Sequence, residues 1–137
     1  MELYKSETCA VEFTDNRLVF LCHGKLESQQ FREALMKALR FAREHHVKQW
    51  LLDLREIGKL SEEEEAWVQV QLFPQIMMHL GTDNHLAVVV DERCYDDMLS
   101  ESGLLGLRSY NSFIVINTFC QLPEAIAWLD KGQSKCA

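Results

Sequence analysis

The sequence predicts an α/β domain with a mixed β-sheet that opens on a β-hairpin and continues as alternating helices and parallel strands, flanked by helices. Three observations predict this fold class. Residues 9–14 and 17–22 alternate between apolar and polar side chains around a turn dipeptide. Segments 50–54 and 85–91 are nearly continuous apolar runs, which is typical of parallel strands covered on both faces. Segments with helical spacing of apolar residues separate these runs.

The opening hairpin turns at Asp15-Asn16, a pair that tolerates the positive φ angles of a two-residue turn. With that loop length, the numbers of facing residues sum to 31, which fixes the register. The predicted facing pairs are Cys9 with Cys22, Val11 with Phe20, and Phe13 with Leu18. The strand 9–14 has the more polar outer face, so we expect it nearer the edge of the sheet.

Two helices are predicted next, one before and one after the apolar run 50–54 in the sequence. Ser28 can cap the first helix, and its apolar positions are Phe31, Leu35, Ala38, Leu39 and Ala42. The second helix is predicted to begin at Ser61, because Ser61 and Glu64 match the capping box. It can run to Leu80 with Gly81 as its stop, and Pro74 predicts a kink or break within it.

The remaining elements are predicted in the order strand 85–91, short helix 95–102, strand 113–119 and closing helix. The short helix is interrupted by Gly103 and Gly106. Pro123 at a first helical position opens the closing helix, and Gly132 is expected to end it. We therefore expect a single domain over residues 1–132 and a flexible tail over 133–137.

Composition narrows the function classes. Lys and Arg total 14 against 21 Asp and Glu, and the net charge of −7 disfavours sequence-independent binding to nucleic acid or anionic lipid surfaces. No apolar segment is long enough to span a membrane, and we expect a cytoplasmic protein. The five cysteines form no CxxC pair and the histidines no HExxH motif, so we expect free thiols and neither a metal nor a cofactor.

Polar side chains at the predicted strand ends form a candidate polar cleft, because ligands of parallel sheets bind beyond the carboxyl ends of the strands. The candidate residues are Asp53, Ser61, Asp91 and Asn117. The alternative is that the aspartates bond loop amides or cap helices, with Arg55 as the partner of a buried carboxylate. A nucleophilic site would need Cys94 or Cys120 beside His85, but His85 begins its strand and Cys94 follows the far end of that strand.

The helix after Ser61 suggests a candidate interface. At 100° per residue, one wide apolar arc is predicted to pack on the sheet; it contains Ala66, Trp67, Val70, Phe73, Met77, Met78 and Leu80. A second stripe, formed by Val68, Leu72 and Ile76, is left on the opposite side without any charged neighbour. This stripe predicts a symmetric homodimer. The alternative is that later segments of the same chain cover it.

Several segments together resemble one bacterial family. They are the LLDL run 51–54, the Ser-capped acidic helix after it, the AVVVD strand 87–91, and a closing F-x-x-x-x-E-A-x-x-W-L pattern over 119–129. On these features the chain resembles the STAS-like, or SpoIIAA-like, bacterial proteins over nearly its whole length. The resemblance implies the mixed α/β fold of anti-sigma-factor antagonists, which is likened to SEC14-type lipid-binding domains and has no established enzyme activity in most members.

The resemblance also bears on Ser61. The antagonists carry a phosphorylatable serine in Asp-Ser-Ser-Gly, and the matching segment here, 59–62, keeps one serine but lacks the aspartate and the glycine. We therefore interpret Ser61 as a helix cap.

The expected function is a non-catalytic regulatory or interaction domain, acting through self-association or a protein partner. The alternative is a carrier that holds a small apolar ligand, such as a lipid or acyl chain, between the sheet and the helix around Met77 and Met78.

Overall fold

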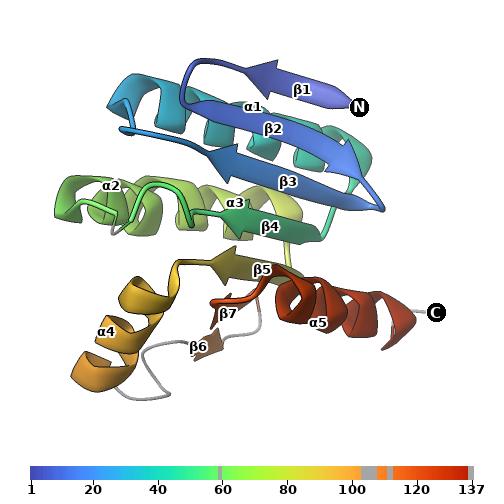
Figure 1. The fold of residues 1–137 in the computed structure, drawn as a ribbon. Helices are drawn as coiled ribbons and strands as arrows, with labels where there is room; N and C mark the ends of the chain where they lie inside the picture. The colour runs from blue at the N-terminus through green and yellow to red at the C-terminus, as the bar shows by residue number, and fades with distance from the viewer. Residues whose placement is uncertain (59, 103–107, 111–112, 136–137) are drawn as a thin grey trace.

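A computed structural model of the chain describes residues 1–58, 60–102, 108–110 and 113–135. Within these residues, seven strands form one sheet in the order β1-β2-β3-β4-β5-β7-β6 (Figure 1). The strands are β1 (Glu2–Lys5), β2 (Cys9–Thr14), β3 (Arg17–Cys22), β4 (Gln49–Asp53), β5 (Asn84–Val89), β6 (Arg108–Tyr110) and β7 (Ile114–Phe119). The helical elements are α1 (Ser28–His45), α2 (Glu62–Trp67), η1 (Val68–Leu72), α3 (Phe73–Leu80), α4 (Glu92–Ser102) and α5 (Leu122–Lys135). The predicted fold class is confirmed.

The β2–β3 hairpin has the predicted register. Cys9 lies opposite Cys22, Val11 opposite Phe20, and Phe13 opposite Leu18. Asp15 and Asn16 have φ angles of 52° and 62°, as a two-residue hairpin turn requires. The sheet edge beyond this hairpin is formed by β1, an antiparallel strand that the sequence analysis did not predict. Its four residues are too few to show an alternating pattern.

The centre of the sheet is parallel. β3, β4, β5 and β7 pair in parallel, and the short β6, also not predicted, adds antiparallel to β7. Every residue of β4 is buried because helices cover both of its faces. Trp50 and Leu52 point into the core beneath α1 and α3, whereas Leu51 points into the smaller core beneath α5. Figure 1 shows this layering, with α1, α2 and α3 behind the sheet and α5 in front of it.

The first helix begins differently from the prediction. Glu27, not Ser28, caps α1: its carboxylate accepts hydrogen bonds from the backbone N–H groups of Gln29 (3.2 Å) and Gln30 (2.8 Å). The hydroxyl of Ser28 does not cap α1 and instead donates a hydrogen bond to the carboxylate of Glu64 on α2. The predicted apolar face is confirmed, since Phe31, Leu35, Ala38, Leu39 and Ala42 are all buried.

The helix that follows Ser61 is interrupted before Pro74, as expected, and the interruption takes the form of a π turn. In η1 the backbone N–H of Phe73 bonds the carbonyl of Val68, five residues back. Pro74 has no N–H to offer the carbonyl of Val70, so an α-helical turn could not have been completed there. A π turn holds one residue more than an α turn and changes which side chains face the sheet.

The predicted interface of Val68, Leu72 and Ile76 is wrong, because the structure turns this stripe toward the core. Leu72 and Ile76 are 1% exposed and belong to the core, and the half-buried Val68 packs against it. The exposed apolar side chains are instead Val70 and Met78, at 66% and 76%. The error came from a constant 100° period and from placing the wider apolar arc inward.

The observed inward positions show the effect of the extra residue. They are Trp67 and Val68, Leu72 and Phe73, Ile76 and Met77, and Leu80. The first step between these pairs is five residues and the next two are four residues.

The closing helix α5 packs on the front face of the sheet over β4, β5 and β7. It continues to Lys135, three residues beyond the stop expected at Gly132. The last two positions of the expected tail, 136 and 137, lie outside the described residues. In the described part of the chain, no helix is long and apolar enough to cross a membrane.

The reversed helix faces can be tested with a matched pair of substitutions. Leu72→Ala should lower the free energy of unfolding by about 2–4 kcal/mol, because it leaves a cavity in the core. Val70→Ala, two residues earlier on the exposed side, should change it by less than about 0.5 kcal/mol. Urea unfolding of both variants checks this, and equal effects would contradict the assignment of faces.

Candidate functional site

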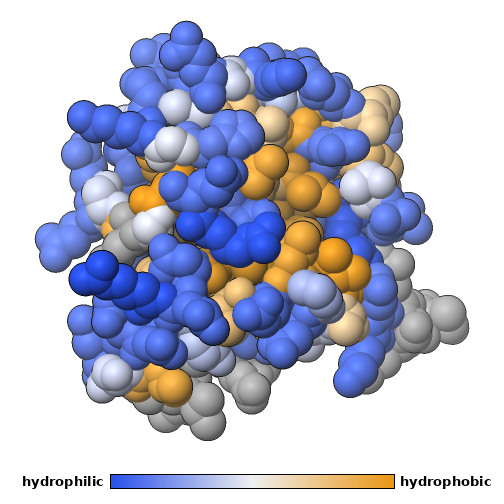
Figure 2. All heavy atoms as spheres, viewed as in Figure 1, coloured by the Kyte–Doolittle hydropathy of each residue, from blue (hydrophilic) through white to orange (hydrophobic). Residues whose placement is uncertain are grey.

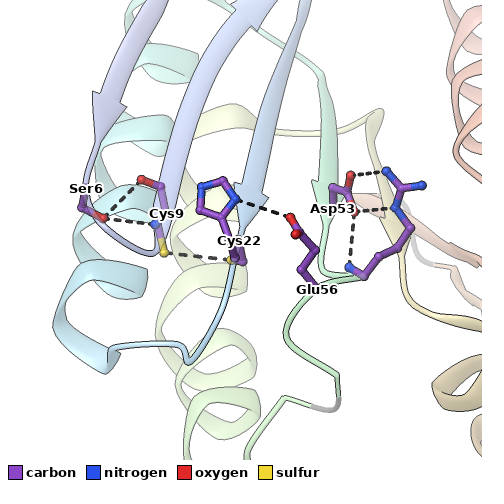
Figure 3. Close-up of polar contacts among 7 residues, drawn as sticks. Ser6, Cys9, Cys22, Asp53 and Glu56 are labelled. Atoms are coloured by element: carbon purple, nitrogen blue, oxygen red, sulfur yellow. Dashed lines mark hydrogen bonds and ion pairs between the residues drawn. The ribbon is translucent and has the colours of Figure 1, made fainter.

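Polar contacts gather at the carboxyl ends of β3 and β4, near the predicted cleft (Figure 3). Asp53, the last residue of β4, is buried, and its carboxylate accepts hydrogen bonds from Arg55 Nε (2.9 Å) and Nη2 (2.7 Å). The backbone N–H of Arg55 also donates to Asp53 Oδ1, at 3.3 Å. Hydrogen bonding to Asp53 raises the pKa of Arg55, so the guanidinium stays charged. Arg55 as the partner of a buried carboxylate is confirmed.

Beside this pair, His23 follows β3 and meets Glu56. Their closest atoms, Nδ1 and Oε2, are 3.4 Å apart, and both side chains are largely exposed. A pair so open to solvent contributes little to stability. The same strand end contains Cys22, whose sulfur faces Cys9 on the other side of the sheet from Asp53 (Figure 3).

Two other residues of the predicted cleft cap helices. Asp91 Oδ1 accepts a 2.7 Å hydrogen bond from the backbone N–H of Cys94 at the start of α4. Ser61 Oγ accepts one of 3.2 Å from the N–H of Glu64 at the start of α2. Both contacts satisfy backbone donors that a helix start leaves open, which is the structural alternative that the sequence had left open for Asp91.

The structure places the four predicted cleft residues at separate positions. Asp53 and Asp91 lie at the same edge of the sheet, since Asp53 pairs with Val89 and Asp91 follows two residues later. Asn117 lies within β7, on the face that α5 covers. Ser61 begins α2 behind the sheet, on the face opposite to Asp53.

One polar cluster was missed by sequence reasoning. Glu64 is 5% exposed, and its carboxylate accepts hydrogen bonds from Ser28 and from Arg32 Nε (3.1 Å) and Nη2 (3.4 Å). Arg32 also lies over the ring of Trp67, 5.5 Å from its centroid. The cluster joins α1 to α2. The available signal was a spacing of four, because Glu64 precedes the half-buried Val68 and the buried residues at 72, 76 and 80 at that interval.

The second missed feature is the outward side of η1 and α3. Its exposed residues are Gln69, Val70, Gln71, Met78 and His79, and with the exposed Ala66 at the end of α2 we call them the uncharged face. No Asp, Glu, Lys or Arg occurs between Glu65 and Asp83. Because Met78 points into solvent, it does not lie between the sheet and the helix, as the apolar-carrier alternative expected.

A second surface lies on the front of the sheet. α5 covers β4, β5 and β7, and the half-buried side chains of Ala10, Val19 and Leu21 on β2 and β3 lie beside it. Figure 2, in the same view as Figure 1, shows apolar surface across the middle of this front, interleaved with polar side chains.

The candidate nucleophile and base lie at opposite ends of β5. His85 is near its start, where Nδ1 lies 3.2 Å from the carbonyl of Asp83 and the ring packs edge-on against Trp128. Cys94 belongs to the first turn of α4, beyond the far end of β5. The two are therefore not arranged as a cysteine–histidine pair.

The Asp53–Arg55 pair yields a stability prediction. Arg55→Ala should lower the free energy of unfolding by about 1–3 kcal/mol, because a buried carboxylate loses its partner. Adding Asp53→Asn to that variant should restore part of the loss, since no charge is then left uncompensated. Urea unfolding of the two single variants and the double variant measures the coupling. Additive effects would contradict a structural role for the pair.

Ser61→Ala should lower the free energy of unfolding by about 1 kcal/mol through loss of the helix cap, without abolishing the fold. Thermal and urea melts, with the exposed Ser100→Ala in α4 as the control, would detect it. A neutral result would show that the Ser61 cap does not stabilise α2.

Comparison with family models finds one match, to SpoIIAA-like, over residues 17–130. The match spans β3 to most of α5 and contains Asp53, Ser61, Asp91 and Asn117. Neither the curated proteins nor the solved structures include a match to this chain. Proteins of the STAS and SpoIIAA-like kind are generally non-enzymatic regulatory domains. Since the family model covers most of the chain, the protein belongs to the SpoIIAA-like family.

Proposed function

We propose that this protein is a non-catalytic interaction domain that forms a symmetric homodimer through the uncharged face of η1 and α3. The observation that carries the proposal is the exposure of Val70 and Met78 on a helix surface without any ionic side chain. A solvated helix face normally carries charged residues, and apolar side chains among amides are typical of partner-facing patches.

The distribution of charge favours a second copy as the partner. The chain has a net charge of −7, so two copies repel one another over most orientations. The uncharged face is where two acidic copies can approach with the least electrostatic cost. In a twofold arrangement the same patch serves both subunits, and Met78 of one copy can pack near Val70 of the other.

The amide side chains around these residues suit such a contact. Gln69 and Gln71 are exposed, and each can both donate and accept a hydrogen bond across a symmetric interface. Gln75 already donates to the carbonyl of Gln71, at 3.1 Å, which holds part of this side in place. The pattern provides an apolar centre with a polar but uncharged rim.

The dimer is tested by Met78→Glu with light scattering coupled to size exclusion across a wide range of protein concentration. The parent protein should be dimeric. The variant should dissociate, with its Kd raised at least about tenfold, because each introduced carboxylate would have to be buried near Val70 of the other copy, between two acidic chains. The fold should survive, since Met78 is exposed in the single chain.

Leu99→Glu is the matched control, because Leu99 is an exposed apolar residue on α4 and the substitution adds the same charge elsewhere. It should leave the dimer intact. A parent protein that stays monomeric at high concentration contradicts the proposal, and a Met78→Glu variant that stays dimeric places the interface elsewhere. Native mass spectrometry of the same samples separates the apolar-carrier function, which requires a co-purifying small molecule.

A further inference from the structure

Two thiols meet in the core at the end of the β2–β3 hairpin. Cys9 and Cys22 are direct cross-strand partners, both are fully buried, and their sulfurs are 3.9 Å apart (Figure 3). Counting outward from the two-residue turn makes this a non-hydrogen-bonded pair, whose Cα atoms are typically about 4.5 Å apart. That spacing lies within the range that a disulfide spans, so the backbone is already in place for one.

The two sulfurs are not equivalent. The hydrogen bond from Cys22 lowers the pKa of Cys9, and a contact between Thr8 Oγ1 and Cys9 Sγ, 3.7 Å apart, acts in the same direction. The pKa of Cys22 is raised, first because its proton is shared with Cys9 and then because of burial. Within the pair, Cys9 is therefore the more acidic thiol and Cys22 the less acidic one, as in reactive dithiols.

We propose that Cys9 and Cys22 form a redox modification site that a hydroperoxide converts into a disulfide within the hairpin. Cys9 first loses its proton to solvent; its thiolate then attacks one peroxide oxygen, breaking the O–O bond and giving a sulfenic acid and a hydroxide that takes up a proton to become water. The sulfur of Cys22 then attacks the Cys9 sulfur, forming the S–S bond and releasing the sulfenic oxygen as water. Overall, two thiols and one hydrogen peroxide give one disulfide and two waters.

The position of the pair gives a small oxidant a route. Cys9 is the first residue of β2 and Cys22 the last of β3, so the pair lies in the core at the open end of the hairpin, next to the turn before β2 and the start of the following loop. Thr8 and His23, the residues that flank the pair, are partly exposed. Oxidation requires a local opening at this end of the hairpin that admits a small oxidant to both sulfurs, and strand ends are among the first parts of a sheet to open.

The disulfide would close a loop from Cys9 to Cys22 that contains the whole hairpin turn. Chain entropy then favours the folded state, and the midpoint of thermal unfolding should rise by about 5–10 °C. The neighbouring Thr8 is hydrogen-bonded to Gln30 on α1 through its hydroxyl (2.7 Å) and its N–H (3.2 Å). Oxidation would therefore stiffen the hairpin where it is attached to the first helix.

The test treats freshly purified protein with hydrogen peroxide, alkylates it under denaturing conditions and measures its intact mass. Untreated protein should show all five thiols. Treated protein should lose about 2 Da and two alkylation sites, and a digest should contain a Cys9–Cys22 crosslinked peptide. The rise in melting temperature should disappear on reduction with dithiothreitol. A digest in which other cysteines are oxidised first, or in which Cys9 and Cys22 stay reduced, overturns the proposal.

Two single variants assign the roles of the sulfurs. Cys22→Ser keeps a hydroxyl donor beside Cys9 but cannot resolve it, so peroxide should leave a dimedone-reactive Cys9 about 16 Da heavier. Cys9→Ser should remove both products. A variant with serine at positions 94, 120 and 136 keeps only the pair and should behave like the parent protein. If this triple variant forms no disulfide, or if Cys22→Ser gives no sulfenic acid on Cys9, the proposal is wrong.

Discussion

The constraint on which the rest of the structure depends is the burial of both faces of β4. All five of its residues are buried, so the strand needs helices on either side and a partner for each polar group it carries. α1 and α3 cover Trp50 and Leu52, and α5 covers Leu51. Gln49 donates to the carbonyl of Leu129 on α5 at 2.6 Å and Asp53 binds Arg55, whereas the buried indole N–H of Trp50 has no hydrogen-bond partner among the described residues. The positions of the helices thus follow from the need to bury the side chains on both faces of β4.

The polar groups near the strand ends are accounted for by the same requirement. Asp53, Asp91 and Ser61 each satisfy a donor that the fold itself presents: a guanidinium and two helix starts. A ligand site would need polar groups in excess of such needs. The surface that the fold itself does not account for is instead an uncharged side of a helix on an acidic protein. For this reason the proposed function is an interaction and not a reaction.

Much of the fold could be predicted from the sequence, because its signals are local. The hairpin register follows from a two-residue turn, and the buried strands follow from uninterrupted apolar runs. The strands β1 and β6 were missed because they are short and are stabilised by pairing with a neighbouring strand. The cap of α1 was misplaced by one residue, since Glu27 and Ser28 are both able to accept from the first turn.

The candidate site was less predictable because it depends on which side of the helix each residue faces. A regular period cannot reveal a π turn, and the wider apolar arc was placed inward, so Leu72 was assigned to the surface and Val70 to the core. The ion pair of Arg32 and Glu64 is equally invisible, since it joins residues 32 apart on different helices. Such contacts arise from packing and are not encoded in a local pattern.

The ion pair between Arg17 and Asp130 has a consequence for the order in which the chain can become native. Arg17 begins β3, is 4% exposed, and meets its carboxylate 113 residues later in the chain, on α5. During synthesis the hairpin emerges first, so its guanidinium must stay hydrated until the last helix leaves the ribosome. The front of the sheet is therefore exposed to water for most of translation, and docking of α5 is the event that excludes water from it.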